Sequence, residues 1–146
     1  MIDPLIYALL LDSEQIEPGE LFYPIEIQDV TENTYLISPL GKVYTSKRKR
    51  LLKQWDNRGY RYVSLGKRPG GRIISHSVHG LVAKHFIPNP FNHPHVHHKD
   101  NNPINNAWNN LEWLSVRDHI EATKRARELR GSHFNPLRNK NSKTDK

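Results

Sequence analysis

The sequence predicts a small α+β protein in which a meander of short strands precedes a helix, a β-hairpin and a second helix. The chain has 146 residues, of which 36% are hydrophobic, so one domain with a small core is expected. Short runs of β-branched and aromatic residues alternate with turn-forming residues across residues 34–74, which is typical of a meander. Apolar residues then recur at helical spacing, first after residue 75 and again after residue 115.

Charge divides the chain into an acidic beginning and a basic remainder. Residues 1–40 hold eight Asp and Glu and no Lys or Arg, whereas all 22 Lys and Arg follow, against seven acids. Such an excess predicts a polyanionic partner, with nucleic acid first and an anionic membrane surface second. We expect no membrane insertion, because no apolar run approaches the roughly 20 residues of a spanning helix. The absence of Cys fits a reducing cytoplasm and excludes disulfides and thiolate metal sites.

The first half divides into an acidic segment and the meander. Residues 1–33 form an acidic N-terminal segment with a short helix over Leu5–Leu11 and a short strand or extended segment over Leu21–Ile27. Its role stays open: it could shield the basic face, contact a partner protein or mimic nucleic acid. The predicted strands of the meander are 34–38, 42–45, 51–55, 60–65 and 72–74, joined by turns at 39–41, 47–50, 56–59 and 66–71. Trp55, Trp108, Trp113, Tyr60 and Tyr62 are expected in the core.

The second half predicts two helices separated by a hairpin. The first helix spans Ser75–Phe86 and ends before a proline-rich connector. The hairpin strands cover 95–99 and 110–114. The second helix opens at Ser115, which has capping-box spacing to Asp118, and runs to Arg130 before Gly131. Residues 132–146 are polar and basic and are predicted to be a disordered tail.

A cluster of histidines lies at the predicted hairpin. His93, His95, His97 and His98 fall within six residues, and Asn110 and His119 follow at intervals of eleven and eight intervening residues. A hairpin packed on a helix brings such residues together. Val116, His119, Ile120 and Thr123 share one helix face, so His119 is expected to point toward the hairpin with these packing residues.

The stretch VHGLVAKHFIPNPFNHPHVHHKDNNPINNAWNNLEWLS resembles the HNH endonucleases of the phage and intron-homing type, with the three motif letters on His98, Asn110 and His119. The upstream segments YLISPLGKVYTS and GYRYVSL resemble a β-rich DNA-contacting module that precedes such units. The resemblance implies a β-rich module over residues 34–75 and a ββα-metal (His-Me finger) nuclease domain over residues 76–131. It also implies a phage or mobile-element endonuclease, in the host cytoplasm if it is phage-encoded.

The resemblance also implies roles for the motif residues. His97 and His119 would hold one divalent ion, Mg²⁺ or Mn²⁺, with Zn²⁺ or Ni²⁺ as alternatives because a His pair here is more like the nuclease colicins. His98 would accept the proton of the attacking water, and Asn110 would position either its imidazole or the loop that carries it. The products would be a 5′-phosphate and a 3′-hydroxyl. His93 and His95 are expected to be bystanders, and Asp100 a hydrogen-bonding residue of the hairpin loop.

Double-stranded DNA is the expected partner of the basic turns, and the protein is expected to be a monomer or a homodimer. The predicted phosphate contacts are Lys47, Arg48, Lys49, Arg50, Arg58, Arg61, Lys67, Arg68 and Arg72. Phosphate contact is favoured for residues 47–50 because they lie with the other basic residues of the meander, and a solvated turn is the alternative. The first alternative function is a non-catalytic DNA-binding module with a structural metal site. The second, ranked last, is a membrane-surface protein.

Overall fold

A computed structural model of the chain describes residues 16, 17, 19–28, 30, 34–66 and 71–131. The predicted Leu5–Leu11 helix, the 132–146 tail and the phosphate contacts assigned to Lys67 and Arg68 lie outside these residues. The described part has the mixed α and β content that the sequence predicts. Within these ranges, no helix combines the length and the apolar character needed to cross a bilayer.

The predicted meander forms two antiparallel sheets rather than one. The first sheet contains β1 (Tyr23–Pro24), β2 (Tyr35–Ile37), β3 (Val43–Thr45) and β4 (Arg50–Leu51) in chain order. The second contains β5 (Trp55–Asn57), β6 (Tyr60–Gly66) and β7 (Ile73–Ser77).

The predicted single strand at 51–55 is therefore wrong, because the chain leaves the first sheet at Leu52. Leu51 packs beside Phe22 and Tyr44, whereas Leu52 packs against a second apolar cluster. The two neighbouring leucines thus join two separate apolar clusters at the point where the chain passes between the sheets.

The second half follows the predicted order with shifted boundaries. Helix α2 spans Val78–Phe86, because the predicted first turn at residues 75–77 instead pairs with β6 as the end of β7. The hairpin strands are β8 (His95–His98) and β9 (Leu111–Leu114), with a 3₁₀ turn η1 (Trp108–Asn110) before β9. Helix α3 spans Val116–Arg130, and Ser115 caps it by accepting a hydrogen bond from the Asp118 backbone, as predicted.

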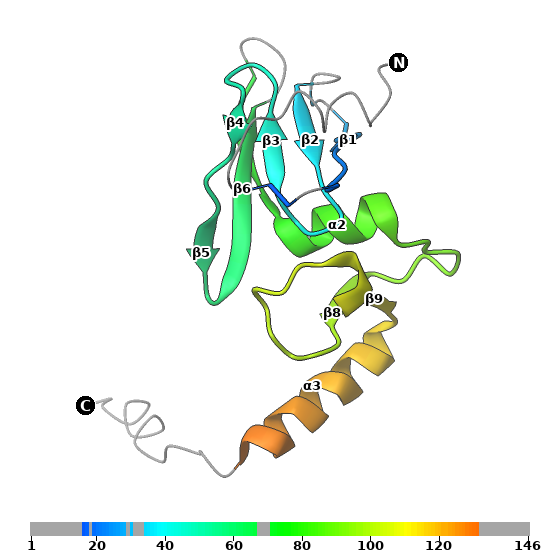
Figure 1. Cartoon of the computed structure of the whole chain (residues 1–146). Coiled ribbons are helices and arrows are strands. Elements are labelled where there is room, and N and C mark those ends of the chain that lie inside the picture. Colours follow the sequence, from blue (N-terminus) through cyan, green and yellow to red (C-terminus); the bar gives the residue numbers. More distant parts are fainter. Residues whose placement is uncertain (1–15, 18, 29, 31–33, 67–70, 132–146) are drawn as a thin grey trace, which may run out of the picture.

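One apolar cluster joins the sheets, α2 and the hairpin. Its buried members are Ile25, Ile37, Val43, Val63, Leu65, Val78, Leu81, Val82 and Leu111. In Figure 1, α2 lies between the two sheets and the hairpin, and α3 lies on the far side of the hairpin. The β8–β9 hairpin is therefore anchored to the upstream strands through α2.

The predicted packing face of α3 and the predicted aromatic core are both wrong in part. Val116 and Ile120 are 53% and 61% exposed, because the half-buried face of α3 is formed by His119, Ala122, Thr123 and Ala126.

Trp55, Tyr60 and Trp108 are 39%, 42% and 51% exposed, since aliphatic side chains fill the core instead.

Candidate active site

His98 lies at the end of β8 and is buried, with 6% of its surface exposed. Its ring packs against His79 of α2 and Tyr60 of β6, with centroid separations of 5.1 Å and 6.0 Å. His79 and Tyr60 also contact each other, at 5.4 Å. Three elements that are distant in sequence thus surround one imidazole.

His79 is neutral in this cluster. Its Nδ1 atom is buried and, in the described part of the chain, has no hydrogen-bond partner. Burial, together with the nearby charge that His98 can carry, lowers the pKa of His79 to about 4. A neutral, apolar-packed ring beside His98 restricts its rotation without adding a competing positive charge at neutral pH.

The His98 ring is hydrogen-bonded to the side-chain oxygen of Asn106, a residue that sequence reasoning missed. The His98 Nε2 atom lies 2.8 Å from Oδ1 of Asn106, and Asn106 is 5% exposed. Asn106 sits among six asparagines between residues 101 and 110, so its type and spacing do not distinguish it.

The hydrogen bonds of the Asn110 side chain among the described residues lie within the loop that follows His98, whereas the His98 ring contacts Asn106. Its Nδ2 donates to Asp100 Oδ1 and to the Asn105 carbonyl, both at 2.9 Å. Its Oδ1 accepts from the Asp100 backbone N–H at 3.1 Å. The loop that follows His98 is thereby closed on itself.

Asp100 is the hydrogen-bonding residue of the hairpin loop, as predicted. Its carboxylate accepts from the Asn105 side chain, the Asn102 backbone and the Asn110 side chain. These hydrogen bonds lower the pKa of Asp100. The carboxylate therefore stays ionised, and its hydrogen bonds lie within the loop.

The two predicted metal ligands lie on facing elements. His97 is on β8, and His119 is in the first turns of α3, where its ring stacks on His95 with a centroid separation of 4.4 Å. His95, expected to be a bystander, is thus a neighbour of the site. The pKa of His119 is lowered by burial and then by the positive charge that His95 and His97 can carry.

The chemistry of these imidazoles bears on the divalent ion that the sequence predicts. A lowered pKa favours neutral imidazole at His119, which is the form that binds metals. Among the described residues, no group of three or more His, Asp and Glu side chains could hold a metal ion together. His97 and His119 stay the predicted pair of nitrogen donors, and an ion held by them would need oxygen ligands from water or a phosphate to complete its shell.

A cavity of about 250 Å³ opens beside the histidines. His97, His98 and Tyr60 line it together with the arginines Arg58, Arg127 and Arg130. Arg58 was predicted to contact DNA, but Arg127 and Arg130 were not, although they lie two and three turns after His119 on the same side of α3. A wider hollow of about 620 Å³ lies beside α3 at Arg117 and Arg125, but none of the histidines in the described ranges lines it.

The other predicted phosphate contacts lie outside this cavity. Residues Lys47 to Arg50 are all exposed at the turn between β3 and β4, where Lys49 has a left-handed φ of 49°. Arg72 is exposed just before β7, and Arg61 is half-buried in β6. The structure therefore brings Arg58 to the histidines and leaves residues 47–50 as a separate basic tip.

Comparison with known proteins relates this site to nucleases, although no protein-family model matches the chain. The chain is 37% identical over 91 residues to DNA endonuclease I-HmuI of Bacillus phage SP01, covering 62% of this chain and 51% of that protein. It is 34% identical over 110 residues to H-N-H endonuclease F-TflII of Escherichia phage T5, covering 73% and 56%. An uncharacterized HNH endonuclease of Acanthamoeba polyphaga mimivirus, L245, is 39% identical over 89 residues, covering 60% and 26%.

The fold is also similar to that of an HNH endonuclease. A structure titled "DNA binding and cleavage by the HNH homing endonuclease I-HmuI" matches with a TM-score of 0.57 at 32% identity, covering 73% of this chain and 58% of that one. The predicted resemblance to HNH endonucleases of the phage homing type is therefore confirmed. The chain spans about half the length of the phage relatives and about a quarter of the mimivirus protein.

Proposed function

We propose that this protein is a divalent-metal-dependent HNH endonuclease that hydrolyses phosphodiester bonds of double-stranded DNA and leaves 5′-phosphate and 3′-hydroxyl ends. The observation that carries the proposal is the shared cavity, in which His97 and His98 meet Arg58, Arg127 and Arg130. Imidazole and guanidinium groups around one small cavity suit a bound phosphodiester. The similarity to phage homing endonucleases supports this assignment.

In this proposal the arginines position the scissile phosphate. Guanidinium groups bind phosphate oxygens through paired N–H donors, and they stay charged at every working pH. Arg58 comes from the β5–β6 turn, whereas Arg127 and Arg130 come from α3, so the phosphate would be held from two sides. The exposed residues 47–50 and Arg72 would contact the DNA backbone farther away.

His98 is proposed to be the general base. It takes a proton from a water molecule whose oxygen attacks phosphorus, while the bond between phosphorus and the 3′-oxygen breaks and that oxygen takes up a proton. A divalent ion held by His97 and His119, Mg²⁺ or Mn²⁺ with Zn²⁺ or Ni²⁺ as alternatives, would supply charge stabilisation at the phosphate and the departing oxygen. Asn110 acts at a distance, by closing the loop that follows His98.

A cleavage assay tests the base. Supercoiled plasmid is incubated with the protein in Mg²⁺, Mn²⁺, Zn²⁺, Ni²⁺ or EDTA, and the ends are examined for 5′-phosphate by ligation. We expect cleavage with at least one metal, none in EDTA, and a loss of about 10²–10⁴ in rate for His98→Ala. His93→Ala is the matched control, since His93 lies outside the cavity and contacts Phe91. Near wild-type cutting by His98→Ala would remove His98 from this role.

Calorimetric titration with Mn²⁺ tests the metal ligands separately. His97→Ala and His119→Ala each remove one of two nitrogen donors, so we expect the affinity to fall by at least about 10- to 100-fold. His98→Ala should bind Mn²⁺ as the wild type does. Unchanged affinity in both ligand variants would place the ion elsewhere, and His95 would be examined next because it stacks on His119.

A further inference from the structure

The turn between β2 and β3 touches the loop that carries Asn106. Gly41 has a φ of +89°, the left-handed conformation that glycine supplies in hairpin turns. A Cβ added at Gly41 would meet the Asn106 Cβ at 3.0 Å and the Asn106 carbonyl oxygen at 3.3 Å. The Trp108 backbone N–H donates to the Pro39 carbonyl at 2.8 Å. This contact joins the upstream β-strands directly to the active-site loop.

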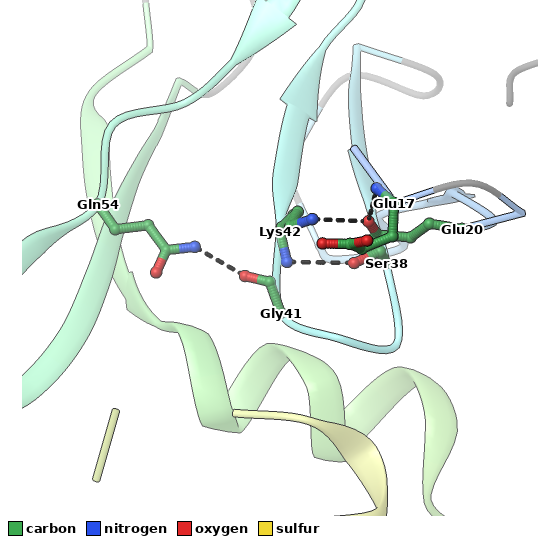
Figure 2. Close-up of polar contacts among 6 residues, drawn as sticks. All are labelled: Glu17, Glu20, Ser38, Gly41, Lys42 and Gln54. Atoms are coloured by element: carbon green, nitrogen blue, oxygen red, sulfur yellow. Dashed lines mark hydrogen bonds and ion pairs between the residues drawn. The ribbon is translucent and has the colours of Figure 1, made fainter. Parts of the chain in front are cut away.

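The same turn is braced from its other side (Figure 2). The Gln54 side chain donates to the Gly41 carbonyl at 2.7 Å, and the Lys42 backbone donates to Ser38 Oγ at 3.2 Å. The Lys42 ammonium pairs at 2.8 Å with Glu20, whose side chain is almost fully buried. Two separate segments, those of Gln54 and Glu20, therefore hold the turn together with its own Lys42–Ser38 hydrogen bond, so it is a fixed surface against which Asn106 packs.

The Asn106 amide oxygen determines which His98 nitrogen carries the proton. An amide oxygen only accepts hydrogen bonds, so the Nε2 atom facing it at 2.8 Å must carry hydrogen. A neutral imidazole has one N–H, and Nδ1 is then the unprotonated nitrogen. Because Asn106 is buried, water competes little for this hydrogen bond.

Building on the proposed role of His98, we propose that Asn106 is a positioning residue that fixes His98 in its Nε2–H tautomer, with Nδ1 as the proton acceptor, and that the Pro39–Gly41 turn holds Asn106 in place. The β-rich segment upstream of α2 would then help to position the general base, in addition to its proposed contacts with DNA. Asn110 has the different task of closing the loop around Asp100.

Nitrogen-15 NMR of the histidine rings in the full chain tests the tautomer without any cleavage. Spectra are recorded at about pH 8.5, where imidazole is neutral. We expect wild-type His98 to show one protonated Nε2 and an unprotonated Nδ1, and Asn106→Asp to keep this pattern because a carboxylate oxygen also accepts. Asn106→Leu should give a tautomer mixture. An Nδ1–H tautomer in the wild type, or an unchanged spectrum in Asn106→Leu, would overturn the inference.

Cleavage by a turn variant tests the brace. Gly41→Ala should lower kcat by about 10- to 100-fold with little change in KM, and should broaden the tautomer distribution of His98. Gly19→Ala is the matched control, since Gly19 has a similar φ of +81° and its added Cβ would meet no atom of the described residues within 4 Å. If Gly41→Ala does not fold, Gln54→Ala, which removes the hydrogen bond to the Gly41 carbonyl, carries the test with a smaller decrease.

Equal kcat in the turn variant and the control would remove the turn from the proposal. The two levels of hypothesis fail differently. Failure of the proposed nuclease function would show as no metal-dependent cutting at all, whereas near wild-type cutting by His98→Ala would show only that His98 is not the base. The tautomer readout depends on neither result, because it reports the Asn106 hydrogen bond directly.

Discussion

The two walls of the histidine cavity differ in how firmly they are built. On the hairpin side, His98 lines the cavity and is 6% exposed. Asn106 and Asn110 do not line it, but they are 5% and 9% exposed and are hydrogen-bonded to the His98 ring and within the loop. On the helix side, every residue of α3 is at least partly exposed, and Arg127 and Arg130 reach the cavity from an open surface. The hairpin side, which carries His98, is pre-organised. The exposed arginines Arg127 and Arg130 on α3, which would bind phosphate, can still adjust their positions.

This difference has a physical reason. A general base must hold its geometry within a fraction of an ångström, and buried hydrogen bonds enforce this because an unpaired buried polar group is costly. A charged contact to a DNA backbone tolerates small displacements, since the attraction depends weakly on geometry. Single substitutions in the hairpin loop should therefore lower folding stability, whereas substitutions at the exposed positions of α3 should change it little.

The largest expected stability effect is at Asn110. Asn110→Ala removes three hydrogen bonds and leaves the loop groups of Asp100 and Asn105 unpaired, so unfolding should become easier by about 2–4 kcal/mol. Urea denaturation measures this. Arg125→Ala on exposed α3 is the control and should change the free energy of unfolding by no more than about 0.5 kcal/mol. Equal effects at both positions would contradict the contrast between the walls.

The next effect is a decrease of stability in acid caused by His79. Its pKa is about 4 in the folded chain and about 6.5 when unfolded, so the unfolded state binds the proton more readily. The stability contributed by neutral His79 is fully present above pH 6.5 and is lost as the pH falls toward 4. This pKa difference corresponds to at most about 3 kcal/mol. His79→Phe should flatten the profile of urea midpoint against pH, whereas His93→Phe should leave its slope unchanged.

The residue types and spacing of the hairpin predicted its part of the site well. The His-rich strand, the Asn-rich loop and the capped helix are local patterns, and they placed His97, His98 and His119 on β8 and α3. Asp100 and Asn110 follow the same logic, because Asx side chains in a short loop bond to nearby backbone groups. The roles of these residues in catalysis and metal binding stay predictions.

The contacts across the fold could not be predicted in this way. Tyr60 and His79 reach His98 only because α2 packs between the second sheet and the hairpin. Asn106 is one asparagine among several, and its selection depends on Gly41, which is distant in sequence. Arg127 and Arg130 follow His119 at helical spacing, which was a usable signal, but the more concentrated run at residues 47–50 drew the prediction instead.

The smallest effect per side chain is expected from that basic tip, and it separates remote DNA contacts from cavity contacts. Removing one Lys or Arg that binds a phosphate should reduce the slope of log affinity against log salt by about 0.9, or about three- to fourfold in affinity between 50 and 200 mM salt. Alanine at Lys47, Arg48, Lys49 and Arg50 should flatten the slope while leaving Mn²⁺ affinity unchanged, because these residues are exposed outside the cavity. Alanine at Arg127 and Arg130 should flatten it less, since two charges are removed rather than four, yet reduce kcat more because these residues line the cavity with His98.

Equal decreases of kcat in both variants would mean that the tip also positions the scissile phosphate. An unchanged slope in the tip variant would identify residues 47–50 as a solvated turn, and DNA would then be held mainly from α3.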